Sequence, residues 1–280
     1  MKFFSLFSPS LKPAWSFSTA HTLWRIIFSH NNFIVGEDRN TDEKLVSFVC
    51  LNATDGKVLW RDKTFSEKWW IGIEGVTNEH LYLHEFKKPD IPEHQGIIAV
   101  DLLTGTELWR NMHCTFLTAT ELFVYGFKDL FERRLYYKMN RQAGEIVEEL
   151  QSLPEDIEPN LQMEKVDFQF PRTAEDTAGD IRDQLRGAAP DEDGNIKSME
   201  FAETGKFLVV NVHMMLPGNK SGAMKNSLYI IDSSVKKKVY SDVLNESTPY
   251  PVPDSFFLDG QTVYYIKERK TLVSLSLANA

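Results

Sequence analysis

The sequence has few cysteines, no excess of basic residues and no long apolar run. Its 280 residues include two cysteines, Cys50 and Cys114, and no CxxC motif. We expect both to be reduced, core or half-buried thiols of a cytoplasmic protein, with the periplasm as the alternative. Lys and Arg number 31 against 40 Asp and Glu. This acidic balance excludes a general nucleic-acid binder, which needs a basic surface for phosphates.

No stretch is apolar enough to predict a membrane span. The best candidate, residues 207–216, contains Asn211 and His213 and falls short of the ~20 apolar residues required. Residues 1–7 are apolar, but the Ser-Pro-Ser that follows cuts them off before the usual h-region of about 7–15 residues. We therefore expect neither a span nor a secretion signal.

The familiar catalytic motifs are also missing. The sequence contains no GxGxxG, Walker loop, GxSxG or HExxH pattern. The segment Asp191-Glu192-Asp193-Gly194 has alternating oxygen ligands, but the glycine and bidentate glutamate that a calcium loop needs are absent at the required positions. We expect no cofactor, no metal and no catalytic residue that a motif identifies.

The negative charge is concentrated in one segment. Residues 151–195 hold twelve acidic and four basic residues, a local charge of −8 out of −9 for the chain. The protein is therefore a nearly neutral body that carries one acidic segment.

Two ungapped stretches of the sequence repeat each other. Residues 52–61 align with residues 101–110, and each follows an apolar run. Both place a glycine (Gly56, Gly105) four residues before a tryptophan (Trp60, Trp109), which is typical of a strand, a tight turn and a second strand. Weaker copies follow, one with Tyr240 in the tryptophan position. Internal similarity at 40–50 residues is typical of an array or a propeller.

The repeats predict an all-β propeller of four-stranded antiparallel blades. We expect five blades, with six or seven as the alternative, in a single domain over residues 1–280. The segment around Trp15 has the same tryptophan ending and is expected to pair with the C-terminal blade, which closes the ring. The predicted strands are 23–28, 33–36, 45–51 and 58–61; 69–76, 80–86, 96–102 and 107–110; 115–120, 122–127, 134–139 and 145–149; 197–203, 207–213, 227–232 and 238–243; and 254–258, 262–267 and 271–277 with the strand around Trp15.

The acidic segment 151–195 interrupts this repeat between blades three and four. It offers one strand at 163–170 and one short helix at 173–186, which begins with a capping-type Thr173 and Asp176. One strand and one helix do not make a blade. We therefore interpret the segment as an insertion.

The x-Asp-x-x-Thr-Gly-x-x-x-Trp pattern of residues 52–61 and 101–110 resembles the repeat of pyrroloquinoline-quinone-type β-propellers. That superfamily includes quinoprotein dehydrogenases, a lipoprotein of the outer-membrane assembly machinery and many uncharacterised bacterial proteins. The resemblance implies that Trp15, Trp60 and Trp109 pack between neighbouring blades.

The sequence departs from the enzymes of that superfamily. Quinoprotein dehydrogenases usually have eight blades, a vicinal disulfide over the cofactor and a calcium site, whereas the two cysteines here are far apart in a shorter chain. The resemblance therefore favours the non-enzymatic members.

The seven histidines do not form a metal motif by spacing. His80 and His84 would share a strand face without forming a helical zinc pair, and His84 could approach His94 across the expected loop 86–95. His113 and Cys114 are adjacent, which puts them on opposite faces of a strand. We expect structural roles for these residues.

Propeller topology places the acidic segment and the loops around Trp69 and Trp70, 86–95 and 216–226 on one face. We predict a monomeric binding or scaffold module that recognises a protein or small ligand there. Trp69 and Trp70 would supply aromatic contacts. Glu74 and Glu200, which lie on the predicted innermost strands, would supply carboxylates. The alternatives are a solvated acidic loop with Trp69 packed in a blade, and a hydrolase or lyase that uses channel carboxylates.

Overall fold

The computed structural model describes residues 11–88, 91–154, 157, 165, 167–174, 187, 195–216 and 222–278 of the chain. The chain divides into two compact units. Unit 1 comprises Met1–Ser18 and Asp167–Ala280, and unit 2 is Thr19–Val166. Within the described ranges, no helix has the length and apolar character that a membrane span requires.

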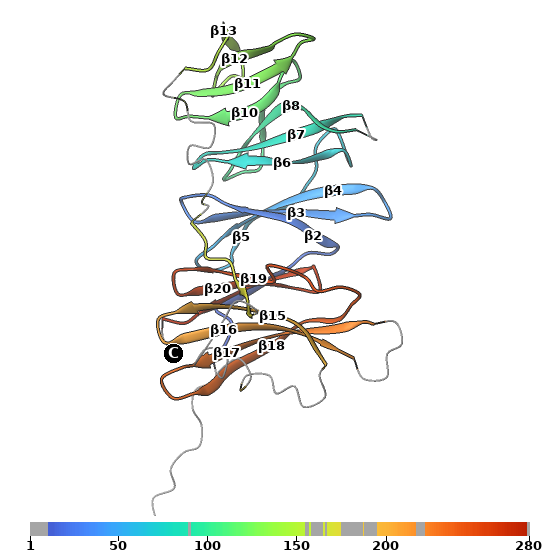
Figure 1. The fold of residues 1–280 in the computed structure, drawn as a ribbon. Helices are drawn as coiled ribbons and strands as arrows, with labels where there is room; N and C mark the ends of the chain where they lie inside the picture. Colours follow the sequence, from blue (N-terminus) through green and yellow to red (C-terminus); the bar gives the residue numbers. More distant parts are fainter. Residues whose placement is uncertain are drawn as a thin grey trace, which may run out of the picture. The chain divides into compact units, whose positions relative to one another are not determined.

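Unit 2 consists of three four-stranded antiparallel sheets that follow one another in chain order (Figure 1). In each sheet the strands are also adjacent in chain order, as in a meander. The strands are β2 (Thr22–Phe28), β3 (Phe33–Asn40), β4 (Leu45–Asn52) and β5 (Val58–Lys63); β6 (Ile71–Val76), β7 (His80–Lys88), β8 (Ile91–Asp101) and β9 (Glu107–Asn111); and β10 (Thr115–Ala119), β11 (Phe123–Asp129), β12 (Arg134–Asn140) and β13 (Ile146–Leu150).

Unit 1 contains two antiparallel sheets. In one of them the N-terminal strand pairs with the C-terminal strand, with Trp15 opposite Ser274, as the sequence predicts. The order of this sheet is β1 (Trp15–Ser18), β21 (Thr271–Ser276), β20 (Thr262–Lys267) and β19 (Phe256–Asp259). The order of the other is β14 (Arg172–Thr173), β15 (Ile196–Thr204), β16 (Phe207–Met215), β17 (Met224–Asp232) and β18 (Lys237–Thr248).

The all-β prediction is confirmed, and the sheets of four or five antiparallel strands are consistent with a propeller. Some strands alternate buried and less buried residues, whereas others, such as β16, are buried over most of their length. In β12, for example, Leu135, Tyr137 and Met139 are buried while the residues between them are less so. Alternation of this kind buries one face of a strand and leaves the other toward solvent or a neighbouring layer.

The structure corrects the expected strand limits in several places. β3 and β18 extend to Asn40 and Thr248, beyond their expected ends at 36 and 243. The segment 86–95 is largely strand rather than loop, because β7 extends to Lys88 and β8 begins at Ile91. Thr173 lies in β14, which adds a fifth strand beside β15, and not at the start of a helix. Most of the acidic segment 151–195, including nearly all of the expected helix, lies outside the described residues.

The tryptophans of the repeat join neighbouring sheets of unit 2. Trp60 donates from Nε1 to the carbonyl of Leu102 at 2.8 Å, and its ring lies over Gly105 in the turn of the next sheet. Trp109 repeats the contact one sheet further on, where it lies over Gly144 and donates to a backbone carbonyl at 2.8 Å. Each tryptophan thus fills the space that a turn glycine leaves open.

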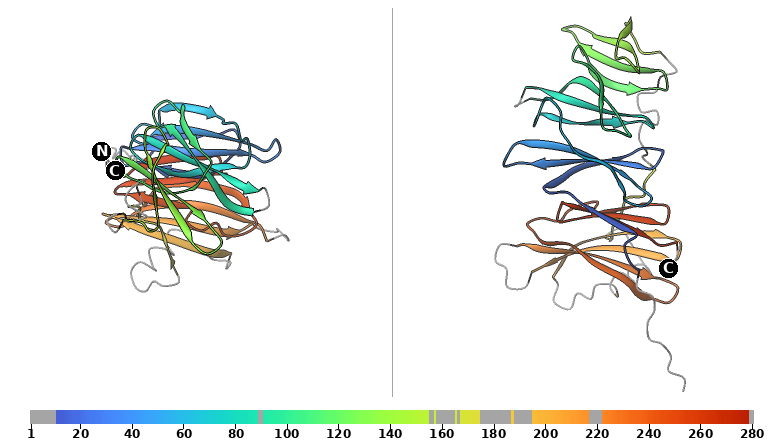
Figure 2. Two further views of the ribbon diagram at one scale, coloured as in Figure 1. Left: turned by 90° about the horizontal axis from the view of Figure 1, so that it is seen from above. Right: turned by 180° about the vertical axis from the view of Figure 1, so that it is seen from behind.

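The remaining repeat residues have their own local contacts. In unit 1, the ring of Trp15 lies 6.1 Å from that of Tyr264, and the hydroxyl of Tyr240 lies 2.6 Å from that of Tyr265. In unit 2, Gly56 has a positive φ of 70°, which a turn residue without a Cβ adopts at little cost. Successive sheets of unit 2 appear as separate layers from behind as well (Figure 2).

We expect Gly144→Ala to lower the free energy of unfolding by about 2–5 kcal/mol. The left-handed backbone (φ 68°) costs an alanine about 1–2 kcal/mol. Its Cβ would also lie 2.3 Å from Cε3 of Trp109, and displacing a packed ring costs about 1–3 kcal/mol more. Urea unfolding followed by tryptophan fluorescence measures the loss.

The matched control is Gly260→Ala. Gly260 has a similar φ of 58°, but a Cβ there would meet no atom within 4 Å. This variant should therefore lose only the backbone contribution, about 1–2 kcal/mol. Equal losses in the two variants would show that the tryptophan contact does not depend on the glycine.

Candidate functional site

Two bulges in the sheet β6–β9 surround His84. The register of β6 and β7 shifts between Ile73 and Gly75, so Glu74 is an extra residue without a cross-strand partner. The register of β7 and β8 shifts at His84, where the facing Gly96 takes a positive φ of 75°. Bulges bend a strand and change the direction of its side chains, and they are frequent next to functional sites.

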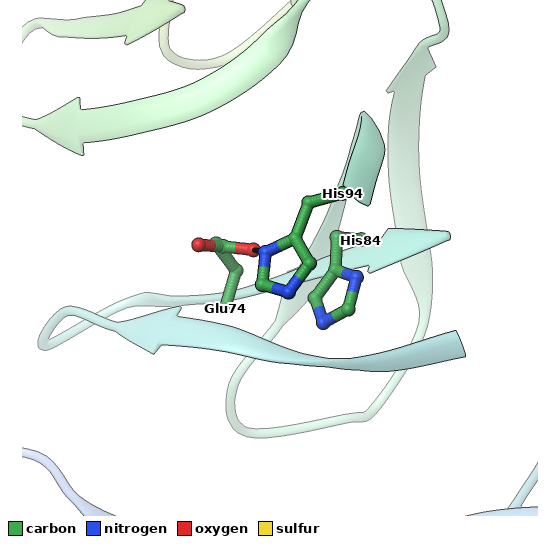
Figure 3. A group of neighbouring side chains, drawn as sticks. All are labelled: Glu74, His84 and His94. Carbon is green, nitrogen blue, oxygen red and sulfur yellow. Dashed lines mark ion pairs between the residues drawn. The ribbon is translucent and has the colours of Figure 1, made fainter. Parts of the chain in front are cut away.

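The bulges bring together one carboxylate and two imidazoles, those of Glu74, His84 and His94 (Figure 3). One ligand atom from each lies within 4.8 Å of the other two. The two imidazole rings are stacked, with centroids 3.6 Å apart and planes 13° apart. Oε2 of Glu74 lies 2.8 Å from Nδ1 of His94. We call these three residues the Glu-His-His cluster.

The cluster extends from the core to the surface. His84 is 3% exposed, whereas the side chain of His94 is 38% exposed. Burial, with a smaller effect of the neighbouring His94, lowers the pKa of His84 to about 4. His84 is therefore neutral at pH 7, and one ring nitrogen carries a lone pair.

A contact with the backbone determines which ring nitrogen of His84 carries the proton. Nδ1 lies 3.3 Å from the carbonyl of Glu85, which only accepts, so this contact assigns the proton to Nδ1 and the lone pair to Nε2. Beside Nε2 the chain has Gly72, where a Cβ would lie 2.9 Å away. Gly72 therefore leaves room next to the lone-pair nitrogen.

Side chains from the adjacent sheet fix the backbone of β6 ahead of Glu74. Arg39 donates to the carbonyl of Ile71 at 2.7 Å, and Arg25 donates to that of Ile73 at 2.7 Å. The amide of Ile73 donates to Oε2 of Glu37 at 3.1 Å. Because β6 is an edge strand, these bonds satisfy groups that no neighbouring strand reaches.

A cavity of about 610 Å³ opens beside the cluster, between the sheet β6–β9 and the sheet β10–β13. This volume lies within the range of small-molecule sites, about 300–1,000 Å³. Its walls combine charged, polar and apolar side chains. They are Glu74, Lys87, Pro92, Glu93, His94, Gln95, Met112, His113, Cys114, Thr115, Phe116, Phe127, Lys128 and Asp129.

Several ionisable groups of the cavity wall are already paired. Lys87 lies 3.1 Å from Glu93, and Asp129 lies 2.7 Å from Arg134. Cys114 is buried, and burial raises the pKa of its thiol to about 12. The thiol is therefore neutral at pH 7 and a poor nucleophile.

The predicted aromatic residues lie close to the cluster. Trp70 and Phe86 make an edge contact with ring centroids 6.1 Å apart. Phe86 in turn contacts the rings of His84 and His94 at 4.9 Å and 5.6 Å. Trp69 is half-buried and packs against the core of unit 2. The structure thus connects Trp70 through Phe86 to the cluster that contains Glu74.

Glu200, the other predicted carboxylate, lies in unit 1 and is 7% exposed. It accepts hydrogen bonds from Nδ2 of Asn211 and from the amide of Asp254, both at 3.3 Å. Burial is the largest influence on Glu200 and raises its pKa, against the effect of these two bonds. Glu74 lies in unit 2, and each of the two carboxylates has its own partners within its unit.

The sequence indicates part of this site. Glu74 is one of the predicted site residues, and His84 is expected to approach His94 across the loop 86–95. The decisive feature, the pair of bulges, has one weak signal in the sequence, which is Gly96 at the start of the expected strand 96–102. The sequence predicts structural roles for the histidines because their spacing places no fourth metal ligand.

Comparison with known proteins adds a partial family match. The family model of a domain of unknown function, DUF4905, matches residues 27–109. This range is less than a third of the chain, and it includes all three cluster residues. No curated protein matches the sequence.

Several solved structures have a weak likeness to the chain. BamB from Moraxella catarrhalis is 6% identical, with 90% of this chain and 83% of that chain covered and a TM-score of 0.31. Quinohemoprotein alcohol dehydrogenase from Comamonas testosteroni is 12% identical over 91% of this chain, with a TM-score of 0.32, and a europium-containing methanol dehydrogenase is 12% identical over 92%, with a TM-score of 0.32. The chain covers 42% and 52% of these two dehydrogenases. TM-scores this low assign neither a fold nor a function.

We expect Glu200→Gln to become more stable relative to the wild type as the pH rises. The folded-state pKa of Glu200 is raised above 4.5, so the wild type loses stability as the pH rises from 4.5 through that raised pKa. The variant has no such loss. Its new amide would also face Oδ1 of Asn211, a buried atom with no hydrogen bond among the described residues.

The measurement is the free energy of unfolding in urea at several values between pH 4 and pH 8. Glu203→Gln, which removes a solvent-exposed carboxylate of the same strand and its ion pair with Arg172, is the control for loss of a carboxylate at the surface. A Glu200→Gln profile parallel to that of the wild type would contradict a raised pKa.

Proposed function

We propose that the protein is a non-enzymatic binding module of the β-propeller type. We further propose five blades in a single domain over residues 1–280, in a monomeric cytoplasmic protein. The five antiparallel sheets of the described residues and the pairing of β1 with β21 support this proposal. So does the repeat that resembles quinoprotein-type propellers.

The observation that carries the binding function is the cavity beside the Glu-His-His cluster. Its wall has apolar surface from Met112, Phe116 and Phe127 next to ionisable groups such as Lys128 and His113. Such a wall suits a small ligand, or the side chain of a partner, that combines an apolar part with a polar group. Trp70 contacts Phe86, which contacts both histidines of the cluster, whereas Trp69 packs against the core.

The chemistry of the cavity favours binding over catalysis. Its thiol, Cys114, is neutral because burial raises its pKa to about 12. The hydrolase or lyase alternative needs ionisable groups that are free to act on a substrate. In the cavity wall, Lys87 is paired with Glu93 and Asp129 with Arg134. Glu200 has the raised pKa of a general acid, but both of its oxygens accept hydrogen bonds from the protein.

A cavity-filling variant tests this function. We expect Met112→Trp to weaken ligand binding at least about tenfold, a loss of about 1.4 kcal/mol, because the indole occupies the space of the ligand. A thermal-shift screen with amino acids, mono- and dicarboxylic acids, hexoses and nucleotides identifies the ligand class. Calorimetry then gives the affinities of wild type and variant.

Leu108→Trp is the matched control, since it adds the same indole to the same sheet outside the cavity wall. Both native side chains are partly exposed, 36% for Met112 and 43% for Leu108, so both variants should fold. The control should bind like the wild type. Equal binding by both variants, or a wild type that none of the panel stabilises, would overturn the small-ligand proposal and leave a protein partner.

A further inference from the structure

We propose that Glu74, His84 and His94 form a binding site for one divalent transition-metal ion, with Zn²⁺ as the preferred ion. This site is independent of the ligand proposed for the cavity, because the metal alone is its ligand. The argument rests on the chemistry of the donors, their separation, a buried atom without a hydrogen bond and the orientation of the imidazoles.

The donor set suits zinc. Imidazole nitrogens are good ligands for Zn²⁺, Cu²⁺ and Ni²⁺, whereas Ca²⁺ and Mg²⁺ prefer oxygen ligands only. Two histidines and one glutamate are a known set of three protein ligands for zinc that leaves a fourth position open. Here that fourth position would face the cavity, because Glu74 and His94 both line its wall.

The separation of the donors is close to that of a coordinated ion. Bonds of about 2.0–2.1 Å in a tetrahedron put ligand atoms roughly 3.3 Å apart. In the cluster the three atoms lie within 4.8 Å of one another. To bring all three donor atoms onto one ion, the partly exposed ring of His94 must rotate away from its stack on His84. The buried ring of His84 keeps its place.

Oε2 of Glu74 has no hydrogen bond among the described residues although it is buried. It lies 2.8 Å from Nδ1 of His94, but the contact does not have the geometry of a hydrogen bond. Its nearest polar neighbour is therefore another potential ligand atom, whereas a buried carboxylate oxygen is usually hydrogen-bonded. A shared cation beside the two atoms would satisfy both.

His84 is oriented as a metal ligand. Its Nδ1 is directed at the carbonyl of Glu85, the contact that commonly orients the ligating histidine of a metal site. Its Nε2 keeps the lone pair, and Gly72 leaves space beside it that a Cβ would fill. Two bulges hold the strands that carry the three residues, so the donors lie on sheet rather than on loop.

The test is titration of the full chain with Zn²⁺ by calorimetry and with Co²⁺ by visible absorption. We expect one ion per chain, and d–d bands of Co²⁺ with the intensity of a four- or five-coordinate site. His94→Gln should weaken binding of both ions at least about 100-fold, since loss of a ligand should cost no less than the loss of an outer-shell partner. Glu74→Gln should weaken it as well.

His30→Gln is the control, because His30 is an exposed histidine outside both the cluster and the cavity wall. Its affinity should equal that of the wild type. His94 is partly exposed, so its variant should fold, and circular dichroism checks this. Binding that survives His94→Gln, or a wild type that binds neither ion, would overturn the metal site. The Met112→Trp result tests the cavity ligand separately.

Discussion

The candidate site depends on how the edge strand β6 satisfies its backbone. One side of β6 pairs with β7, and the other side has no strand beside it in its sheet. Charged side chains of the adjacent sheet take that place, since Arg25 and Arg39 bind carbonyls and Glu37 binds an amide. Glu37 is 2% exposed and contacts Arg39, so these charges are paired as well as hydrogen-bonded. A buried charge without such partners would be costly. The arrangement therefore fixes β6 in position up to the bulge at Glu74.

Backbone irregularities collect around the same point. The extra residue Glu74, the positive φ of Gly96 and the close approach of Gly72 to His84 all lie within one corner of the sheet. Each departs from a regular ladder, and each changes where a side chain points or makes room for one. Burial of His84 also opposes its charged form and lowers its pKa to about 4. Irregular geometry of this kind is concentrated at sites where side chains must converge.

The sequence predicts the strands well because their signals are local. Alternating burial marks β12, and turn glycines such as Gly105 and Gly144, with positive φ, mark the hairpins. The site is less predictable because its geometry comes from pairing between strands. The segment 86–95 is expected to be a loop, yet β7 extends to Lys88, β8 begins at Ile91, and Phe86 pairs with His94. The bulge at Glu74 depends on the register of β6 against β7, which the sequence of β6 alone does not encode.

A glutamate and a histidine occur at equivalent positions in one sheet of each unit, but their surroundings differ. In unit 2, Gly72 pairs with His84, and Glu74 follows two residues later; in unit 1, Ser198 pairs with His213, and Glu200 follows two residues later. Without a bulge at Glu200, this residue faces Asn211 directly and accepts its amide, and His213 accepts the amide of Val252 at 3.0 Å. His94 pairs with Phe86, two residues after His84. The equivalent residue in unit 1, which pairs with Met215 two residues after His213, is Met224. In the sheet of unit 1, Glu200 and His213 therefore hold the segment 252–254 by hydrogen bonds. In the other, a bulge and one additional histidine leave one potential ligand atom from each of three residues within 4.8 Å of the others beside a cavity.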